Sequence, residues 1–230
     1  MTRPVRVLIV DDSAYIRKVV KEMLSSQASI EVVGTARDGE DALDLVERLR
    51  PDVVTCDLIM PGVGGVEFIR RQMAARPVPI VIVSIAAESS ERVLSGLDAG
   101  AIDFVQKPTA LATERVFDLA EELASKIVAA AEAPLGRIRE IAPVEPLPHT
   151  TSSGRYDVVV LGVSTGGPQG LKTVIPRLPA DFPVPLVIVL HMPIGYTEAY
   201  AKRLDELSAL TVVEAREGEL LRPGLVLVAP

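Results

Sequence analysis

The stretch that decides the fold of the first half of this 230-residue chain is Val5-Arg6-Val7-Leu8-Ile9-Val10-Asp11-Asp12. A short β-branched run that leads straight into polar residues predicts a buried strand followed by a loop. Further runs of the same kind follow at 30–34, 53–56, 80–84 and 102–105. Together they predict a sheet assembled from five short strands.

Amphipathic stretches separate these runs and predict helices. The clearest has apolar residues at helical spacing, namely Ile16, Val19, Val20, Met23 and Leu24. Others lie at 42–49, at 93–97 before a helix-stop signal at Ala99-Gly100, and at about 111–131. Alternation of strand and helix is typical of a parallel α/β sheet with helices on both faces, and function in such sheets gathers at the carboxyl ends of the strands.

The amino-acid pattern of the chain changes after the last of these helices. Four prolines and a Thr150–Gly154 polar run interrupt any apolar period, which indicates a linker. A second α/β pattern then begins, with strand-like runs at 157–162, 185–190, 211–213 and 225–228 and helices near 171–175 and 197–207. We therefore predict a first domain over 1–128, an interdomain linker over 129–155 and a second domain over 156–230.

Composition excludes several classes of protein. Hydrophobic residues make up 48% and charged residues 24%, a balance typical of a globular protein. No apolar stretch approaches the roughly 18 residues of a membrane span, and the N-terminus lacks a secretory pattern. The net charge is −7, no basic stripe is visible and there is no tryptophan, so we expect no nucleic-acid partner and no direct membrane insertion. With a single cysteine, the sequence predicts a cytoplasmic protein.

Polar residues stand where the predicted strands of the first domain end. Asp11 and Asp12 follow the first strand, Asp57 follows the third, Ser84 ends the fourth and Lys107 ends the fifth, before Pro108. Converging carboxylates repel one another unless a cation lies among them, and Mg²⁺ suits such oxygen ligands. One carboxylate can then attack a phosphoryl donor, while the lysine neutralises the transferring oxygens and a hydroxyl at Ser84 donates to the bound group.

These residues, together with Asp57-Leu58-Ile59-Met60-Pro61 and Gly64-Gly65, make residues 5 to about 125 resemble the receiver domains of two-component response regulators. The resemblance implies a flavodoxin-like fold with a five-stranded parallel sheet. It implies Asp57 as phosphoacceptor, and Asp12, Asp57 and the carbonyl of Ile59 as Mg²⁺ ligands. It also implies roles in phosphoryl binding and switching, carried by Asp11, Ser84, Phe104 and Lys107.

The second domain contains Gly162-Val163-Ser164-Thr165-Gly166-Gly167-Pro168 between a strand and a helix. Such a turn can cradle a phosphate, or it can present a serine nucleophile beside an oxyanion hole. His191 ends the next strand-like run, so it can meet Ser164 at the same sheet edge and act as its base.

The larger pattern favours the nucleophile. The receiver, the linker, the Ser164 turn, Leu190-His191-Met192-Pro193 and the segment from Glu214 to Pro230 resemble the CheB-type chemotaxis protein-glutamate methylesterases. The resemblance implies an enzyme that hydrolyses glutamyl methyl esters on methyl-accepting chemotaxis receptors, with glutamine deamidation in many members. It implies Ser164 as nucleophile, His191 as general base, Thr165 and Gly166 in the oxyanion region, and no cofactor for the ester chemistry. A chemotaxis histidine kinase would supply the phosphoryl group, and the receiver would restrain the hydrolase until Asp57 is phosphorylated.

One departure from the family pattern leaves an alternative open. The triad of the family has a third member, an aspartate in a Gly-rich segment, and residues 156–230 hold no convincing counterpart. We therefore expect a partial doubly wound methylesterase domain, truncated relative to the family. The alternative is a non-enzymatic receiver module that acts as a phosphoryl sink.

Overall fold

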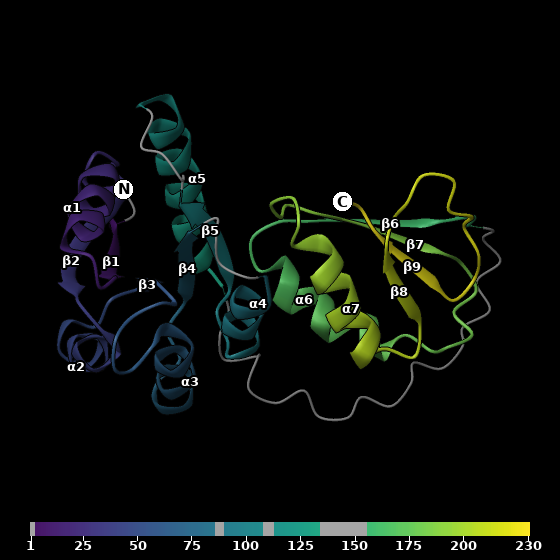
Figure 1. Cartoon of the computed structure of the whole chain (residues 1–230), viewed down its shortest axis with the longest axis horizontal. Coiled ribbons are helices and arrows are strands. Elements are labelled where there is room, and N and C mark those ends of the chain that lie inside the picture. Colours follow the sequence, from purple (N-terminus) through teal and green to yellow (C-terminus); the bar gives the residue numbers. More distant parts are fainter. Residues whose placement is uncertain (1–2, 86–89, 108–112, 134–155) are drawn as a thin grey trace. The chain divides into compact units, whose positions relative to one another are not determined.

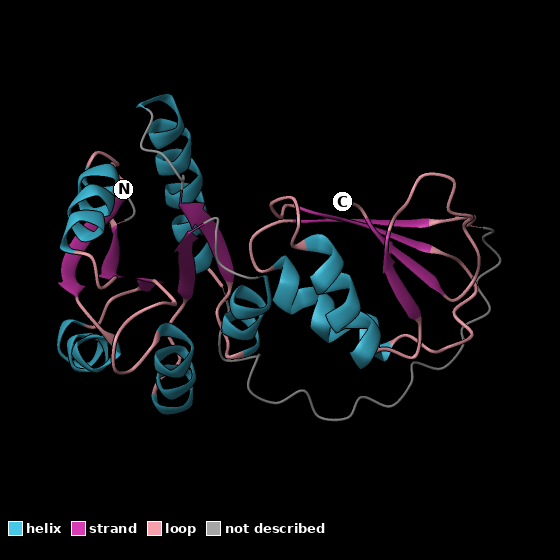
Figure 2. Cartoon of the chain, viewed as in Figure 1, coloured by secondary structure: helices cyan, strands magenta, loops and turns pink. Residues whose placement is uncertain are grey.

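The computed structural model describes residues 3–85, 90–107, 113–133 and 156–230. The chain divides into two compact units, residues 1–136 and 137–230. In both, helices and strands alternate along the chain, except that the last two strands of the second unit follow one another without a helix between them (Figures 1 and 2). Within the described ranges, no helix combines the length and the apolar character needed to cross a bilayer.

The first unit is a parallel five-stranded sheet with the strand order β2-β1-β3-β4-β5. Its strands are β1 (Val5–Val10), β2 (Ile30–Ala36), β3 (Val53–Cys56), β4 (Ile80–Ile85) and β5 (Asp103–Lys107). Its helices are α1 (Ala14–Ser25), α2 (Gly39–Leu49), α3 (Gly65–Ala75), α4 (Ser90–Asp98) and α5 (Thr113–Ala131). The predicted parallel α/β fold of this half is confirmed.

Helices cover both faces of this sheet. Figure 1 shows α1 and α5 on one face and α2, α3 and α4 on the other. The core on the α1–α5 side joins buried residues of all five strands to helix residues such as Leu24, Leu123 and Ile127. Strands buried on both faces explain why the sequence reads as nearly continuous apolar runs rather than as an alternating pattern.

Helix α3 was not singled out by the sequence pattern. It buries Phe68 and Ile69, but the next residue on the same face is Gln72, whose side chain is also buried. The Gln72 Nε2 group donates to the backbone oxygen of Arg76 at 2.6 Å, which satisfies the amide at the end of the helix. A polar residue in the buried stripe hides the helical period from a reading of hydrophobicity.

The second unit holds a parallel four-stranded sheet with the order β6-β7-β9-β8. Its strands are β6 (Val159–Val163), β7 (Leu186–Leu190), β8 (Thr211–Glu214) and β9 (Leu225–Val228). Helices α6 (Gly167–Val174) and α7 (Thr197–Leu207) and a short 3-10 turn, η2 (Ile175–Arg177), lie on one side of this sheet (Figure 1). The second predicted α/β pattern is therefore present.

The expected linker lies mostly outside the described residues, and Pro108 does too. Residues 129–131 belong to α5, so the last receiver helix runs into the first positions of the range expected to be linker. The domain boundaries otherwise stay a prediction.

Candidate functional site

The first candidate site forms where β1, β3 and β5 end. Val10 pairs with Cys56, and the backbone N–H of Asp57 donates to the carbonyl of Val10 at 2.9 Å, so Asp11 and Asp57 leave neighbouring strands side by side. Lys107 is the last residue of β5. Parallel pairing thus brings together side chains that are far apart in the sequence.

Carboxylate oxygens of Asp11, Asp12 and Asp57 lie within 4.8 Å of one another. The Lys107 ammonium donates to Asp11 Oδ2 at 2.6 Å and to Asp57 Oδ2 at 2.5 Å. Lys107, Asp11 and Asp57 are buried, whereas Asp12 is exposed. The arrangement pairs one cation with two of the three carboxylates and leaves an acidic, oxygen-only donor set open to solvent on the Asp12 side, which fits a hard divalent cation.

The charges of this cluster shift the proton affinity of its members. Burial raises the pKa of Asp11 above its usual range, the Lys107 ammonium opposes that shift, and the Asp57 carboxylate adds to it. Burial by itself would lower the pKa of Lys107, but the Asp57 and Asp11 carboxylates outweigh it and raise that pKa. Lys107 therefore stays cationic at neutral pH and remains available to bind anionic oxygen.

The remaining predicted receiver residues lie on β4, on β5 and in the loop after β3. Ser84 lies in β4, fully buried, and its Oγ has no hydrogen-bond partner in the structure. Phe104 lies in β5 with 1% of its surface exposed. The N–H of Ile59 donates to Asp57 Oδ1 at 3.1 Å, which holds the loop after β3 against the carboxylate. An unpaired buried hydroxyl is costly, so the Ser84 hydroxyl would gain from an acceptor brought within its reach.

Two supporting side chains were missed by the sequence analysis. Arg17 of α1 donates to the backbone oxygens of Asp11 at 2.7 Å and Asp12 at 3.0 Å, and so fixes the acidic pair. Lys126 of α5 is buried against β5. Its position in the apolar stripe of α5, three residues after Leu123, is a signal that a search for charged residues at core positions would have found.

The second candidate site lies at the ends of β6 and β7. Val163 pairs with Leu190, and the N–H of His191 donates to the carbonyl of Val163 at 3.2 Å. Ser164 and His191 are thus the next residues of two adjacent parallel strands, and both are exposed. Among the described residues, no hydrogen bond joins the two side chains. The backbone brings the predicted nucleophile and base to one edge.

Thr165 and Gly166 lie between Ser164 and the first residue of α6. Gly166 has φ +77°, a left-handed conformation that suits glycine, and the N–H of Gly167 closes the turn by donating to the Ser164 carbonyl at 2.7 Å. A shallow pocket beside Ser164 is lined by this turn and by Leu171 and Val174. A helix N-terminus directed at the site stabilises negative charge there.

Helix α7 supports this turn. The Tyr200 hydroxyl donates to the Pro168 carbonyl at 2.7 Å, and the buried Thr197 hydroxyl donates to the Glu214 carboxylate at the end of β8. Neither contact is visible in the sequence, because each joins elements that only the fold brings together.

Comparison with known proteins supports this two-part organisation. Residues 7–116 match the response regulator receiver domain family, and residues 159–230 match the CheB methylesterase family. A protein-glutamate methylesterase/protein-glutamine glutaminase of Myxococcus xanthus is 49% identical over 98% of this chain and 66% of its own length. A relative of the same name from Symbiobacterium thermophilum is 47% identical over 99% of this chain and 67% of its own length.

Among solved structures, the response regulator domain of Thermotoga maritima CheB is 37% identical, with a TM-score of 0.53 over 57% of this chain and 98% of that one. The chain spans about two thirds of the length of its curated relatives. With both family patterns in succession and relatives this similar, the chain belongs to the CheB-type family of protein-glutamate methylesterases that carry a receiver domain, a family of hydrolases.

Proposed function

We propose that this chain is a protein-glutamate methylesterase whose activity is controlled by phosphorylation of Asp57. The observation that carries the proposal is the Lys107 ammonium between Asp57 and Asp11, in a chain that also presents Ser164 and His191 at adjacent strand ends. The similarity of the relatives over nearly the whole chain supports an enzyme rather than a non-enzymatic phosphoryl sink.

Asp57 is the phosphoacceptor in this proposal. Asp12, Asp57 and the carbonyl of Ile59 would hold Mg²⁺, which when bound would neutralise charge during phosphoryl transfer. An oxygen of Asp57 attacks the phosphorus of the donor, and the leaving group departs on the opposite side. Lys107 exchanges its contact with Asp57 for the phosphoryl oxygens, and the Ser84 hydroxyl donates to the same group.

Ser164 is the nucleophile of the hydrolase. Its hydroxyl oxygen attacks the carbonyl carbon of a glutamyl methyl ester while His191 accepts the hydroxyl proton. Backbone N–H groups at Thr165 and Gly166 stabilise the oxyanion, and methanol leaves with the proton that His191 returns. Water then attacks the acyl carbon while His191 accepts its proton, and His191 returns that proton to the leaving Ser164 oxygen as glutamate is released. With a glutamine side chain the leaving group is ammonia, and this chemistry requires no cofactor.

The partners in this proposal are those of the family. The substrates are methylated chemotaxis receptors, the phosphoryl donor is a chemotaxis histidine kinase, and the enzyme works in the cytoplasm, where both present their signalling domains. The receiver restrains the hydrolase until Asp57 is phosphorylated. The receptor and the kinase both enter this proposal through the family.

The decisive experiment measures methanol released from a receptor with labelled methyl esters, using the 230-residue chain with Mg²⁺ and acetyl phosphate. Release should be abolished by Ser164→Ala, whereas Asp57→Asn should lose only the stimulation by acetyl phosphate. Ser125→Ala, at an exposed position on α5, is the control and should match the wild type. Unchanged release by Ser164→Ala would show that the nucleophile is assigned wrongly.

A further inference from the structure

A buried lysine that the proposed phosphorylation chemistry does not use lies on helix α5. Only 5% of the Lys126 side chain is exposed, and its neighbours in the helix, Leu123 and Ile127, belong to the core. A lysine is almost never fully buried unless it is paired. Its contacts therefore show what it does.

Lys126 binds the strand that carries the aromatic residue of the first site. Its ammonium donates to the backbone oxygen of Phe104 at 2.7 Å and to Asp103 Oδ1 at 3.2 Å, and it lies 5.7 Å from the centroid of the Phe104 ring. Asp103 Oδ1 also accepts the N–H of Phe104 at 2.7 Å. Lys126 and Asp103 thus hold Phe104 through its backbone as well as through its ring.

The same strand ends at the phosphorylation site. Phe104 and Lys107 are both residues of β5, and β5 pairs with β4 so that Phe104 lies opposite Ile82 and Lys107 opposite Ile85. Lys107 contacts Asp57 Oδ2, an oxygen of the carboxylate that would be phosphorylated. A phosphoryl group on Asp57 must change this contact, and a hydrogen-bonded strand carries such a displacement to Phe104, three residues away.

We propose that Lys126 is a positioning residue of the switch: its ammonium group couples β5 to helix α5, so that phosphorylation of Asp57 is transmitted to α5. The inference rests on the proposed function of Asp57 as phosphoacceptor. Helix α5 is the last described element of the first unit, and the second unit follows it in the sequence.

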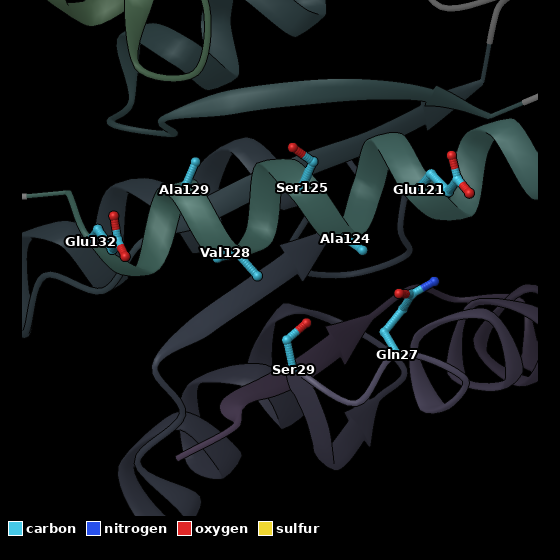
Figure 3. A pocket seen from close by; sticks show the side chains of 8 residues that line it. All are labelled: Gln27, Ser29, Glu121, Ala124, Ser125, Val128, Ala129 and Glu132. Carbon is cyan, nitrogen blue, oxygen red and sulfur yellow. The ribbon is translucent and has the colours of Figure 1, made fainter. Parts of the chain in front are cut away.

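The opposite side of α5 leaves room for such a change. An open groove separates the helix from the turn before β2, and Figure 3 shows Ala124 and Val128 directed toward Gln27 and Ser29 across it. The helix residues along the groove include Ala124, Ser125 and Ala129, which are small. Helix α5 thus has a charged contact with β5 on one side and a groove on the other.

The test compares amide hydrogen exchange of the full chain with and without beryllium fluoride and Mg²⁺, which mimic a phosphoryl group on an aspartate. In the wild type, exchange should change both around Lys107 and in α5 over residues 119–131. In the double variant Asp103→Asn/Lys126→Met, which removes both buried charges, the change around Lys107 should persist and the change in α5 should be lost.

Glu122→Gln is the matched control. Glu122 also contacts Lys126, at 3.3 Å, but its side chain is 37% exposed, and the substitution leaves the Phe104 and Asp103 contacts in place, so its α5 response should equal that of the wild type. If the double variant unfolds, Lys126→Arg replaces it, because it keeps the charge but not the geometry of a point donor, and should show a weaker α5 response.

The inference is overturned if the exchange of α5 changes as much in the double variant as in the wild type. The same holds for Lys126→Arg where that variant is used instead. It is also overturned if the exchange of α5 does not change in the wild type. If exchange around Lys107 does not change in the wild type either, the proposed function fails before the role of Lys126 is tested. That result overturns Asp57 as phosphoacceptor, and the inference falls with it.

Discussion

The two parallel sheets of this chain differ in how they are covered. The first lies between two layers of helices, and its central strand β3 is buried at every residue. The second has α6 and α7 on one face, while on the other face, among residues 156–230, Val160 is 61% and Val189 is 50% exposed. Similar apolar strands are therefore buried on both faces in the first sheet and partly exposed on one face in the second.

This difference also separates the two candidate sites. In the first sheet, burial brings Asp11, Asp57 and Lys107 into direct contact, so the site is assembled by charge pairing in a low dielectric. In the second, Ser164 and His191 are exposed and are positioned by the backbone of β6 and β7. The first site should therefore respond sharply to changes in charge and packing, and the second sheet should tolerate changes on its open face.

The largest effect is expected at the acceptor itself. Asp57→Asn keeps the shape of the side chain but removes the nucleophilic carboxylate, so phosphoryl incorporation from acetyl phosphate should fall to background, as it should when EDTA removes Mg²⁺ from the wild type. Mass spectrometry of the intact chain measures the product. Asp44→Asn is the same change at an exposed position on α2, and this variant should incorporate the phosphoryl group as the wild type does. A phosphorylated Asp57→Asn chain would contradict the assignment.

The next effect is on stability in the first unit. Lys126→Met leaves the Asp103 carboxylate buried without its cation, and breaking a buried pair in this way costs about 3–5 kcal/mol of unfolding free energy. The loss of unfolding free energy is measured by urea unfolding, monitored through hydrogen exchange of the β1 amides. Adding Asp103→Asn should recover most of the loss, because the unpaired charge disappears. Equal losses in the single and double variants would show that packing, not charge, dominates.

A smaller effect is expected where α3 begins beside the acceptor. A Cβ on Gly65 would lie 2.1 Å from the Asp57 backbone oxygen and 2.7 Å from Leu58 Cα, so Gly65→Ala must displace the loop after β3. Such overpacking costs about 1–3 kcal/mol, and phosphorylation should slow because Asp57 moves.

The adjacent Gly64 is the matched control for that substitution. A Cβ there meets its nearest atom at 3.6 Å, an ordinary contact, so Gly64→Ala should phosphorylate at the wild-type rate. Equal rates for the two alanine variants would show that the loop does not position Asp57.

The sequence predicts what local patterns encode. Short β-branched runs identify every strand, and polar residues at their ends identify Asp57 and Lys107, because parallel strands converge at one edge. It does not predict Gln72 or Lys126 as buried, because a polar residue in an amphipathic helix is expected to face solvent. Only the structure shows the backbone oxygens that satisfy them, that of Arg76 at the end of the same helix and that of Phe104 in β5. The Thr197–Glu214 contact likewise depends on how α7 packs near the end of β8.

The smallest expected effect, on unfolding free energy, compares the two sheets directly. Val54→Thr in β3 and Val189→Thr in β7 replace one methyl group by a hydroxyl, at a fully buried and at a half-exposed position. In β3 the hydroxyl must be desolvated without a designed partner, which costs about 1–3 kcal/mol. In β7 it stays hydrated, so unfolding free energy should change by less than about 0.5 kcal/mol. Urea denaturation, monitored through hydrogen exchange of amides in each sheet, reports the stability of each unit separately. A loss at Val189 as large as that at Val54 would mean that the second sheet is covered on both faces in solution, as the first one is.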